Sequence, residues 1–576
     1  MTSSGAPGTV GETTFVVEIL DAFPAKALNE PGAPAEIVVE LHTTVPLDAR
    51  LMAELQDRGD VIVTAERTVA AVRGTSRVVL TLNVPGDDAR GYSVLVRVFW
   101  QGGETTASTA LLAASHWRLL PRYGFLSDFN PMEKSGATDS EHVDLLARFH
   151  VTAVQFYDWM YRHYRFLPPA DAIDGADETF TDAMGRVVSL AAVRKRIAEC
   201  QRSGMATIAY GAVYGPEPEF ILDRPDWLLY DAAGEPLHLI ERFYITDLRP
   251  GGWREHILGE FESAIRDMGF DGIHMDQYGF PKLAYDSDGE LVDVGAQFGP
   301  LIDEAATRVA AVRDGAAVIF NAVNAWPLTA VAGSDQAAVY IEVWSPHDTY
   351  RDLVALVRSA RAASGKQAIL AAYLRAFHEP GSAAEWSLRF ATAVINAAGG
   401  HHLLLGEGDA VLREPYYPDH GRLTHDGLSV ARRYYDHTAA NAHYLHAGDL
   451  QPVENYYATG INTALNLVGA PASVSPEAGK VWIAIAQRPG QYVVNLVNLT
   501  GMDDEQWDVA RSEPPALEGL RLECEPFIRI QRVTYASPDV IGDNGSPLEV
   551  RVDTSGRVSV PLPKLWLWQT IVIDHV

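Results

Sequence analysis

The sequence predicts a multidomain protein whose centre is a (β/α)8 barrel with an all-β domain on each side. Three observations support this. The chain has 576 residues, which exceeds the roughly 100–200 residues of one domain. Between about 120 and 410, eight short apolar runs alternate with helical patterns. Outside that region, strand-like segments follow one another without helices. We place the domains at residues 1–117, 118–450 and 451–576.

The N-terminal region reads as a series of short strands. These segments are rich in Val, Leu and Thr, and turn sequences such as PGAP, PGDD and QGGE separate them. Short strands at this spacing favour an antiparallel sandwich. The predicted strands are residues 14–20, 35–45, 61–69, 76–84, 92–100 and 108–116.

The central region changes to a strand–helix rhythm. Trp253, Ile257, Phe261 and Ile265 recur every four residues, and Gly269 follows as a helix stop. Eight alternations of this kind in about 300 residues predict a (β/α)8 barrel. The eight apolar runs are residues 122–129, 151–159, 205–215, 269–279, 317–324, 339–345, 367–374 and 401–409.

After about residue 450 the sequence predicts strands without helices. Residues 481–499 form two apolar runs around a Pro-Gly turn, and residues 548–563 repeat that form around a turn with Gly556. The apolar stretch 565–576 ends the chain. We expect a second antiparallel β-domain here.

Bulk composition excludes several classes of protein. The formal net charge of −29 disfavours nucleic acid or an anionic membrane as a partner, because both attract cationic surfaces. It suits a neutral substrate such as a sugar, and equally a soluble acidic surface. Cys200 and Cys524 are too few for a disulfide framework or a cysteine metal site. No run of 18 apolar residues predicts a membrane span.

The N-terminal sequence MTSSGAPGTVGETT has neither a cationic start nor an apolar core. We therefore expect a cytoplasmic protein. Secretion stays open, because removal of a signal peptide would leave the same appearance.

Each apolar run of the barrel ends in a polar group. In such barrels the active site lies at the carboxyl ends of the strands, so these ends predict a polar pocket rich in carboxylates and aromatic rings. The end residues are Asp128, Asp158, Tyr210, Tyr214, Asp276, Asn321, Asn324, Glu342, Tyr373 and Glu407.

The run FDGIHMDQYG carries two carboxylates with different expected roles. Asp276 lies at the strand mouth, whereas Asp271 lies at the strand start and is expected to cap or pair locally. His274 shares side-chain parity with Asp276. It is expected one layer below the site, either as a core histidine or as support for the catalytic groups.

Carboxylates on different strands, surrounded by aromatic residues, suit glycoside hydrolysis. One carboxylate attacks the anomeric carbon or activates water, and a protonated one donates to the leaving oxygen. Any single aspartate is more often a loop cap, but Asp276 and Glu342 both follow apolar β-branched runs. The nearby aromatic residues either stack on sugar rings or pack around the pocket. No HxH, HExxH or P-loop pattern appears, so we expect no metal and no cofactor.

Several stretches together resemble glycoside hydrolase family 66, the dextranases and cycloisomaltooligosaccharide glucanotransferases. They are RYGFLSDF, VQFYDWMYRHY, the Gly204–Tyr210 segment with Tyr214, FDGIHMDQYG, FNAVN, YIEVWS, and LLLGEGD with the later YYP. They run in family order across the barrel. The family layout adds an N-terminal immunoglobulin-like β-sandwich and a C-terminal antiparallel β-sandwich, so the resemblance covers nearly the whole chain.

The resemblance implies a retaining enzyme that acts on α-1,6-linked glucan. Asp276 matches the nucleophile, Glu342 the acid/base, and Asp158 an aspartate that supports the substrate. Arg162 or Arg165 could instead pair with Asp158. Strand alternation is expected to point Tyr157 and Trp159 away from Asp158. The full set of expected substrate-binding residues is Asp158, Tyr157, Trp159, Tyr210, Tyr214, His274, Gln277, Asn321, Trp344, Tyr373 and Glu407.

Two alternatives to a hydrolase stay open. The first is a cyclising or other α-1,6-glucanotransferase, in which a sugar replaces water as acceptor. Cyclising relatives carry a carbohydrate-binding insertion after strand seven, whereas residues 374–400 have room for no such module, which favours hydrolysis. The second is a non-catalytic glucan-binding protein, which the presence of both carboxylates disfavours. The expected partner is an α-1,6-linked glucan or oligosaccharide, and the sequence leaves the oligomeric state unknown.

Overall fold

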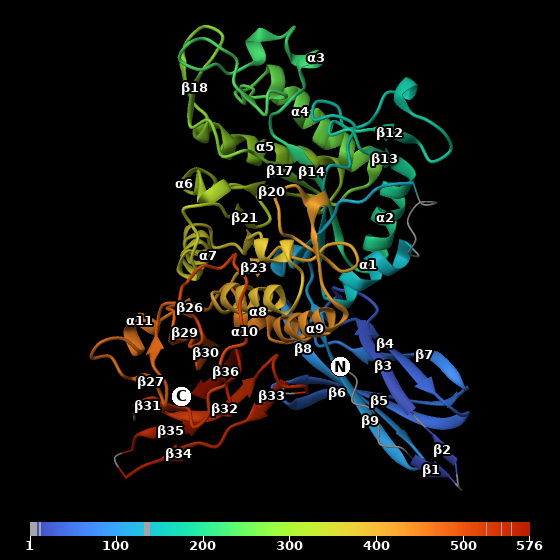
Figure 1. Ribbon diagram of the computed structural model, residues 1–576, viewed down its shortest axis with the longest axis vertical. Coiled ribbons are helices and arrows are strands. Elements are labelled where there is room, and N and C mark those ends of the chain that lie inside the picture. Colours follow the sequence, from blue (N-terminus) through green and yellow to red (C-terminus); the bar gives the residue numbers. More distant parts are fainter. Residues whose placement is uncertain are drawn as a thin grey trace.

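The computed structural model divides the chain into an N-terminal β-region, a central barrel and a C-terminal β-region (Figure 1). Part of the segment used for the signal-peptide prediction, and one residue of the predicted strand 14–20, lie outside the described residues. The described residues are 8–10, 13–15, 17–131, 139–525, 527–542, 544–554 and 556–576.

The predicted barrel is confirmed as a nearly closed ring of eight parallel strands. Each predicted apolar run contains one strand, and the strands pair in chain order. Where the last strand meets the first, the Phe125 amide donates to the Leu405 carbonyl at 3.1 Å. The strands are β10 (Tyr123–Leu126), β11 (Ala153–Phe156), β14 (Ala206–Ala212), β17 (Gly272–Asp276), β20 (Ala317–Asn321), β21 (Val339–Glu342), β22 (Ala368–Ala371) and β23 (His401–His402).

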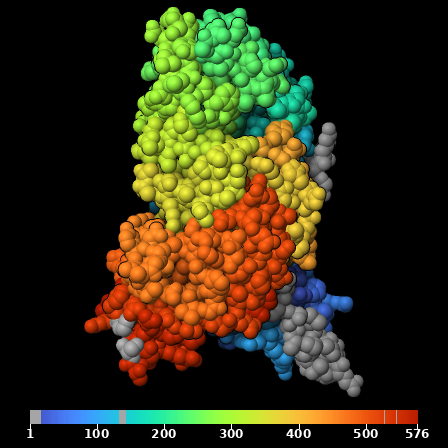
Figure 2. All heavy atoms as spheres, turned by 60° about the vertical axis from the view of Figure 1, so that its left-hand side comes forward, coloured from blue at the N-terminus to red at the C-terminus, as the bar shows by residue number. Residues whose placement is uncertain are grey.

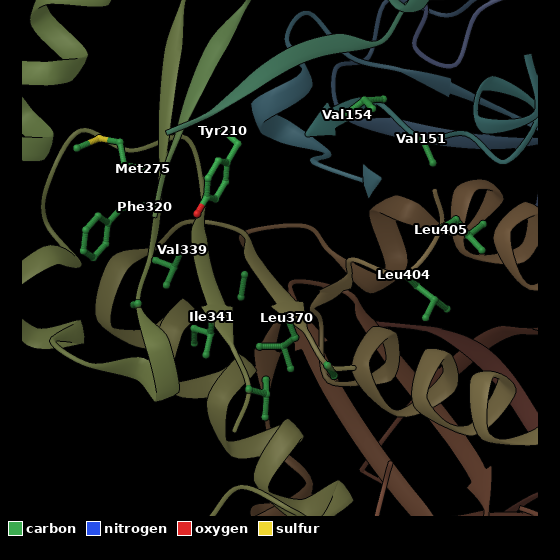
Figure 3. Close-up of a cluster of buried hydrophobic side chains, with 14 of the residues drawn as sticks. Val151, Val154, Tyr210, Met275, Phe320, Val339, Ile341, Leu370, Leu404 and Leu405 are labelled. Atoms are coloured by element: carbon green, nitrogen blue, oxygen red, sulfur yellow. The ribbon is translucent and has the colours of Figure 1, made fainter. Parts of the chain in front are cut away.

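Strand alternation divides the barrel side chains into two sets. Outward residues such as Met275, Phe320 and Val339 pack between the strands and the surrounding helices (Figure 3). Inward residues, among them Tyr123 and Tyr340, fill the barrel interior. The principal surrounding helices are α1 (Asp139–Arg148), α2 (Leu190–Arg202), α4 (Gly252–Ser263), α5 (Gly295–Val312), α7 (Tyr350–Ser364), α8 (Ser382–Ala397) and α9 (His425–Ala440).

The helix predicted from Trp253, Ile257, Phe261 and Ile265 is confirmed. All four side chains are buried, in α4 and the π-helical turn η5 (Ala264–Met268) that continues it. Gly269 then ends the helix at φ +83°, a left-handed conformation that glycine adopts without steric cost. The helix stop therefore leads directly into β17 and its catalytic candidate.

Four hairpins lie in the connections that follow barrel strands, and hence at the barrel mouth. Figure 1 shows β12, β13 and β18 at the end of the molecule remote from the flanking β-regions. The hairpins are β12 (Thr179–Thr181) with β13 (Val187–Ser189), β15 (His238–Leu239) with β16 (Phe243–Tyr244), β18 (Leu283–Tyr285) with β19 (Leu291–Asp293), and β24 (Ala410–Val411) with β25 (Gly421–Arg422).

The N-terminal region has two antiparallel sheets, β3-β4-β7 and β6-β5-β8-β9, around one hydrophobic cluster. Strand β5 was not predicted, although it pairs with both β6 and β8. A short hairpin, β1 (Gly8–Val10) with β2 (Thr13–Phe15), precedes them. The other strands are β3 (Val17–Pro24), β4 (Pro34–Thr43), β5 (Leu47–Asp57), β6 (Asp60–Ala71), β7 (Gly74–Asn83), β8 (Arg90–Trp100) and β9 (Gly103–Ala113).

The C-terminal region also has two antiparallel-rich sheets around one cluster. The hairpin predicted over 481–499 is confirmed as β29 (Val481–Arg488) and β30 (Gln491–Asn498), and β36 (Trp568–His575) pairs with β30. A one-turn helix, α11 (Glu454–Tyr457), corrects the expectation of strands alone. The other strands are β26 (Gln451–Pro452), β27 (Leu465–Val468), β28 (Ala472–Ser473), β31 (Arg521–Cys524), β32 (Ile530–Ala536), β33 (Asn544–Pro547), β34 (Arg551–Val552) and β35 (Val558–Pro561).

Both β-regions pack on the same side of the barrel. Helix α9 contacts β8 and β9, and α8 contacts β30. The two regions also contact each other, because Arg58 forms an ion pair with Asp574 at 2.5 Å. Figure 2 shows the red residues of the C-terminal region packed directly against the yellow residues of the barrel. Across the described ranges, no helix combines the length and apolar character needed to cross a membrane.

Candidate active site

The side-chain amide of Asn321 joins the two predicted catalytic carboxylates. Its Nδ2 donates to Asp276 Oδ1 at 2.8 Å and to Glu342 Oε2 at 3.0 Å. Its Oδ1 accepts from the Glu342 backbone amide at 3.2 Å. These residues end β17, β20 and β21, three neighbouring strands. Asp276 and Glu342, which are 66 positions apart in sequence, thus meet at one nitrogen atom because both lie at the carboxyl ends of these neighbouring parallel strands.

The shared amide limits the separation of the two carboxylates. Since Asp276 Oδ1 and Glu342 Oε2 lie 2.8 and 3.0 Å from the same nitrogen, these oxygens are at most about 6 Å apart. Carboxyl groups of retaining glycosidases are about 5–5.5 Å apart, whereas inverting enzymes need about 6.5–9.5 Å to admit water. The geometry fits a direct attack by one carboxylate.

Two tyrosines complete the hydrogen bonding of the pair. The Tyr210 hydroxyl donates to Asp276 Oδ2 at 2.8 Å, and the Tyr373 hydroxyl donates to Glu342 Oε1 at 2.6 Å. Both carboxylates stay half-buried, so they are reachable from the barrel mouth. The expected proximity of Tyr210, Asn321 and Tyr373 to the carboxylates is thus what the structure shows.

Burial raises the pKa of both carboxylates. It raises the pKa of Glu342 to about 7, and the negative charge of Asp276 adds to the rise. Burial also raises the pKa of Asp276, but hydrogen bonds from Asn321 and Tyr210 oppose that rise. The charge of Asp276 thus favours the protonated form of Glu342, which holds its proton on a substantial fraction of molecules near neutral pH. This is the division that a nucleophile and a general acid require.

Changing Tyr373 to Phe is expected to shift the alkaline limb of the kcat/KM profile upward by about one pH unit. The Tyr373 hydrogen bond lowers the pKa of Glu342, and a bond to a charged group is worth about 1.5–3 kcal/mol. Without it, Glu342 keeps its proton to higher pH. Steady-state rates across pH test this, with Tyr456→Phe on exposed α11 as control. A limb that stays in place would contradict the acid role of Glu342.

Asp158 lies beyond the end of β11, in a left-handed conformation with φ +48°. It is only 7% exposed. Burial raises its pKa to about 7, the Arg186 guanidinium opposes that rise, and the charges of Asp182 and Asp276 add to it. Asp158 thus lies within electrostatic reach of the nucleophile candidate. The alternative in which Asp158 pairs with Arg162 or Arg165 is corrected, because the arginine beside its carboxylate is Arg186.

Arg186, on the β12–β13 hairpin, was missed by sequence reasoning. Its guanidinium donates to the Asp158 carbonyl at 2.9 Å and lies 3.5 Å from the Asp158 carboxylate. It also pairs with Asp182 at 2.8 Å and donates to the Ser127 carbonyl at 3.4 Å. Arg186 therefore ties together connections that follow different strands. Nothing in the local sequence GRVVSL distinguishes it from an ordinary surface arginine.

The aromatic residues divide into two groups. Tyr157 and Trp344 are half-buried near the carboxylates. Tyr157 stacks on Tyr417 with ring centroids 4.2 Å apart, and Trp344 meets the edge of Tyr373 at 5.8 Å. Tyr417 belongs to the YYP motif, but the sequence assigned it no role. Tyr157 packs against the inward-facing cluster of the barrel, where its ring also contacts Tyr210.

Trp159 does not reach the site. It is fully buried against Phe166 and Phe270, and its indole N–H donates to the Tyr210 carbonyl at 3.2 Å. The expected sugar contact is corrected to packing behind the strand that carries Tyr210. Regular alternation would place Trp159 on the inner face with Tyr157, but the left-handed backbone at Asp158, with φ +48°, interrupts the alternation.

Tyr214 and Gln277 are likewise buried. Tyr214 accepts from the Tyr278 amide at 2.8 Å and donates to the Phe280 carbonyl at 3.1 Å. Gln277 donates to the Asn321 carbonyl at 3.0 Å. Both expected sugar contacts are corrected, because Tyr214 already bonds to the chain after β17 and Gln277 bonds to that chain and to the end of β20. They hold Asp276 and Asn321 in place.

Glu407 and His274 also differ from the expectation of substrate contact. Glu407 is buried and accepts from the backbone amides of Ser127 and Asp128, and from the Ser127 hydroxyl at 2.9 Å. The Glu407 carboxylate thus stabilises the connection that follows β10. His274 is buried one layer below Asp276, within 3.3 Å of the Tyr123 hydroxyl, and burial lowers its pKa to about 3.

The structural role expected for Asp271 is confirmed. Its Oδ2 accepts from the Thr207 amide and hydroxyl, both at 2.9 Å, and Arg313 pairs with its other oxygen at 2.8 Å. Asp271 thus ties the start of β17 to β14. In the part of the chain that the structure describes, no group of three or more His, Cys, Asp or Glu side chains is arranged to hold a metal ion.

Comparison with known proteins gives concordant matches. The model of glycosyl hydrolase family 66 matches residues 24–572. A cycloisomaltooligosaccharide glucanotransferase of Niallia circulans is 23% identical, covering 96% of this chain and 71% of the relative. A dextranase of Streptococcus salivarius is 22% identical, covering 90% of this chain and 72% of the relative.

A solved structure shares the fold. The crystal structure of a Paenibacillus sp. cycloisomaltooligosaccharide glucanotransferase, complexed with cycloisomaltoheptaose, superposes with a TM-score of 0.87. It is 22% identical, and the match covers 96% of this chain and 99% of that chain. This likeness concerns the whole arrangement of barrel and flanking sheets.

Proposed function

The chain belongs to glycosyl hydrolase family 66, and we propose that it is a retaining glycoside hydrolase that cleaves α-1,6-glucosidic linkages in dextran or isomaltooligosaccharides. The observation that carries the mechanism is the amide of Asn321 shared by Asp276 and Glu342. It keeps one oxygen of each carboxylate within about 6 Å of the other, which supports a double displacement. The names of the dextranase and glucanotransferase relatives support the substrate class.

The reaction proceeds in two steps. Asp276 attacks the anomeric carbon and forms a glycosyl-enzyme ester, while Glu342 gives its proton to the departing glycosidic oxygen. Glu342 is then ionised and takes a proton from water, which attacks the same carbon and releases Asp276 as a carboxylate. The raised pKa of Glu342 supports both roles, since the group can gain and lose a proton near pH 7.

Product analysis separates the proposed hydrolase from its alternatives. We expect incubation with dextran and linear isomaltooligosaccharides to yield shorter linear sugars. The short connection between β22 and β23, with only η7 (Arg375–His378) and α8, supports hydrolysis over cyclisation. Cyclic or elongated products as the main output would identify a glucanotransferase. Binding without any product would identify a non-catalytic protein.

The anomer released first reports the stereochemistry. We expect the α anomer, because two inversions at one carbon restore the original configuration. Proton NMR of the first minutes of hydrolysis distinguishes it before mutarotation mixes the anomers. A first product in the β form would mean inversion, and Asp276 would then activate water rather than attack.

A further inference from the structure

Two adjoining cavities lie at the base of the barrel, at the end opposite to the carboxylate pair. Their volumes are about 500 and 440 Å³, and both are lined by Gly365, Lys366, Gln367 and Gly448. Residues 366 and 367 directly precede β22, whereas the candidate active site follows the strands. The N-terminal region contributes to the larger cavity, and the C-terminal region contributes to both. We call the joined space the basal cavity.

The lining of the basal cavity is strongly cationic, although the chain has a net charge of −29. The sole acidic lining residue among those described is Asp88, whose carboxylate accepts from the backbone of Ala89 and from the amide and hydroxyl of Ser115. The cationic lining residues are Arg90, Arg118, Arg358, Arg361, Lys366 and Arg488.

Half of these cations bond to neutral acceptors. Arg118 donates to the carbonyls of residues 315 and 316, and its buried Nε has no partner. Arg361 donates to the carbonyls of residues 399, 446 and 447 and to the Gln367 side chain. Lys366 donates to the carbonyls of residues 332 and 334. These bonds satisfy donors but leave the charges unneutralised.

The other three cations have carboxylate partners that do not line the cavity. Arg90 pairs with Asp57 at 3.0 Å, Arg358 pairs with Glu454, and Arg488 lies 3.9 Å from Asp449. Helix ends add little compensation, because the carbonyl ends of α7 and α8 each carry roughly half a negative charge. With these half charges and the negative charge of Asp88 counted, an excess of about one positive charge stays with Arg118, Arg361 and Lys366.

The pKa shifts of the cavity cations agree with this excess of positive charge. Burial lowers the pKa of Arg361, and it lowers that of Lys366 despite the attraction of Asp335 and Asp303. Arg432, which is buried but ion-paired, behaves oppositely: Asp436 and Asp21 raise its pKa in spite of burial. The basal cavity thus holds cations whose charge the protein compensates only in part.

We propose that the basal cavity binds a small molecule with two or more phosphate charges. Guanidinium groups form paired hydrogen bonds to phosphate oxygens, and the cations at Arg118, Arg361 and Lys366 bond only to neutral acceptors. A volume of about 500 Å³ is within the range of small-ligand sites. Because all three regions line the cavity, a bound polyanion links them and stabilises their packing.

Pyrophosphate is the first probe, used with the full chain. We expect the unfolding temperature to rise with pyrophosphate concentration, since a ligand of the folded state shifts the unfolding equilibrium. Sodium chloride at matched ionic strength is the control for screening. An equal rise in chloride, or no saturable heat in calorimetry, would overturn the proposal.

Substitutions locate the binding. We expect Arg118→Gln combined with Lys366→Gln to weaken pyrophosphate binding at least tenfold, with kcat/KM on glucan unchanged. Arg488→Gln on the C-terminal wall gives a second, independent variant. Arg551→Gln, on exposed β34 outside the cavity, removes the same charge as a control. Equal weakening in the control, or none in the cavity variants, would show that binding is non-specific.

Two further probes identify the source of the phosphate. Tighter binding of glucose 6-phosphate than of inorganic phosphate, lost in the cavity variants, supports a phosphorylated sugar as ligand. Tighter binding of pyrophosphate than of both supports a ligand recognised by its phosphate groups alone. If none of the three anions binds at millimolar concentration, the cavity is not a phosphate site.

Discussion

Changing Asp276 to Ala is expected to lower turnover on isomaltooligosaccharides by several orders of magnitude. The substitution removes the group proposed to attack the anomeric carbon, and covalent catalysis is lost with it. The fold should persist, because Asp276 ends β17 and Asn321 keeps its bonds to Glu342. Asp276→Gly with added azide gives a sharper result: a small nucleophile in the vacant space attacks the same carbon and restores turnover.

Changing Glu342 to Gln tests the proposed acid/base role of Glu342, again by measuring turnover on isomaltooligosaccharides. We expect a comparable loss with substrates whose leaving group needs a proton. Because burial raises the folded-state pKa of Glu342 to about 7, its ionisation destabilises the folded protein as pH rises from about 4.5 through 7. The glutamine side chain cannot ionise, so the Glu342→Gln variant should have an unfolding temperature at pH 8 that matches or exceeds that of the wild type. Near-normal rates in either variant, with an unchanged unfolding temperature, would remove the pair from the mechanism.

The barrel and its carboxylate pair were predictable because both follow from periodicity. Buried parallel strands appear as short apolar runs, and a polar residue at the end of such a run must lie at the barrel mouth. Asp276 and Glu342 follow regular strands, so their positions required no knowledge of loops. The same rule predicted Asn321 and Tyr373.

The remaining differences arise where regular geometry stops. Strand β5, with the sequence LDARLMAELQD, consists largely of helix formers, and its pairing with β6 and β8 overrides that propensity. Gln277 and Glu407 follow strands as predicted, but local backbone groups already occupy their side chains. Arg186 comes from a hairpin inserted after β11, and sequence periodicity carries no information about where such a hairpin folds.

Asp158 illustrates the same limit and leads to the second large prediction. Regular alternation places Gln155 and Tyr157 on the inner face of β11, which would direct Asp158 outward. Its left-handed backbone, at φ +48°, instead turns the carboxylate toward the site and Arg186. Such a conformation is uncommon for a residue other than glycine and is often associated with function. A carboxylate held there can accept hydrogen bonds from sugar hydroxyls near Asp276.

We expect Asp158→Asn to lose at least a hundredfold in kcat/KM, which corresponds to about 2.7 kcal/mol. Hydrogen bonds to sugar hydroxyls tighten as positive charge develops on the ring, so kcat should fall along with binding. Azide should not rescue this variant, because a small nucleophile cannot replace a group that grips hydroxyls.

The competing account is that Asp158 serves only as a structural partner for Arg186, which lies 3.5 Å from its carboxylate. The two accounts differ in what Arg186→Met does. If Asp158 binds sugar, loss of the cation should raise its pKa further, since Arg186 now lowers it, and the acid limb of the kcat/KM profile should move to higher pH. If Asp158 is only structural, Asp158→Asn and Arg186→Met should both unfold several degrees early while keeping their specific activity, and Asp158 would leave the active site.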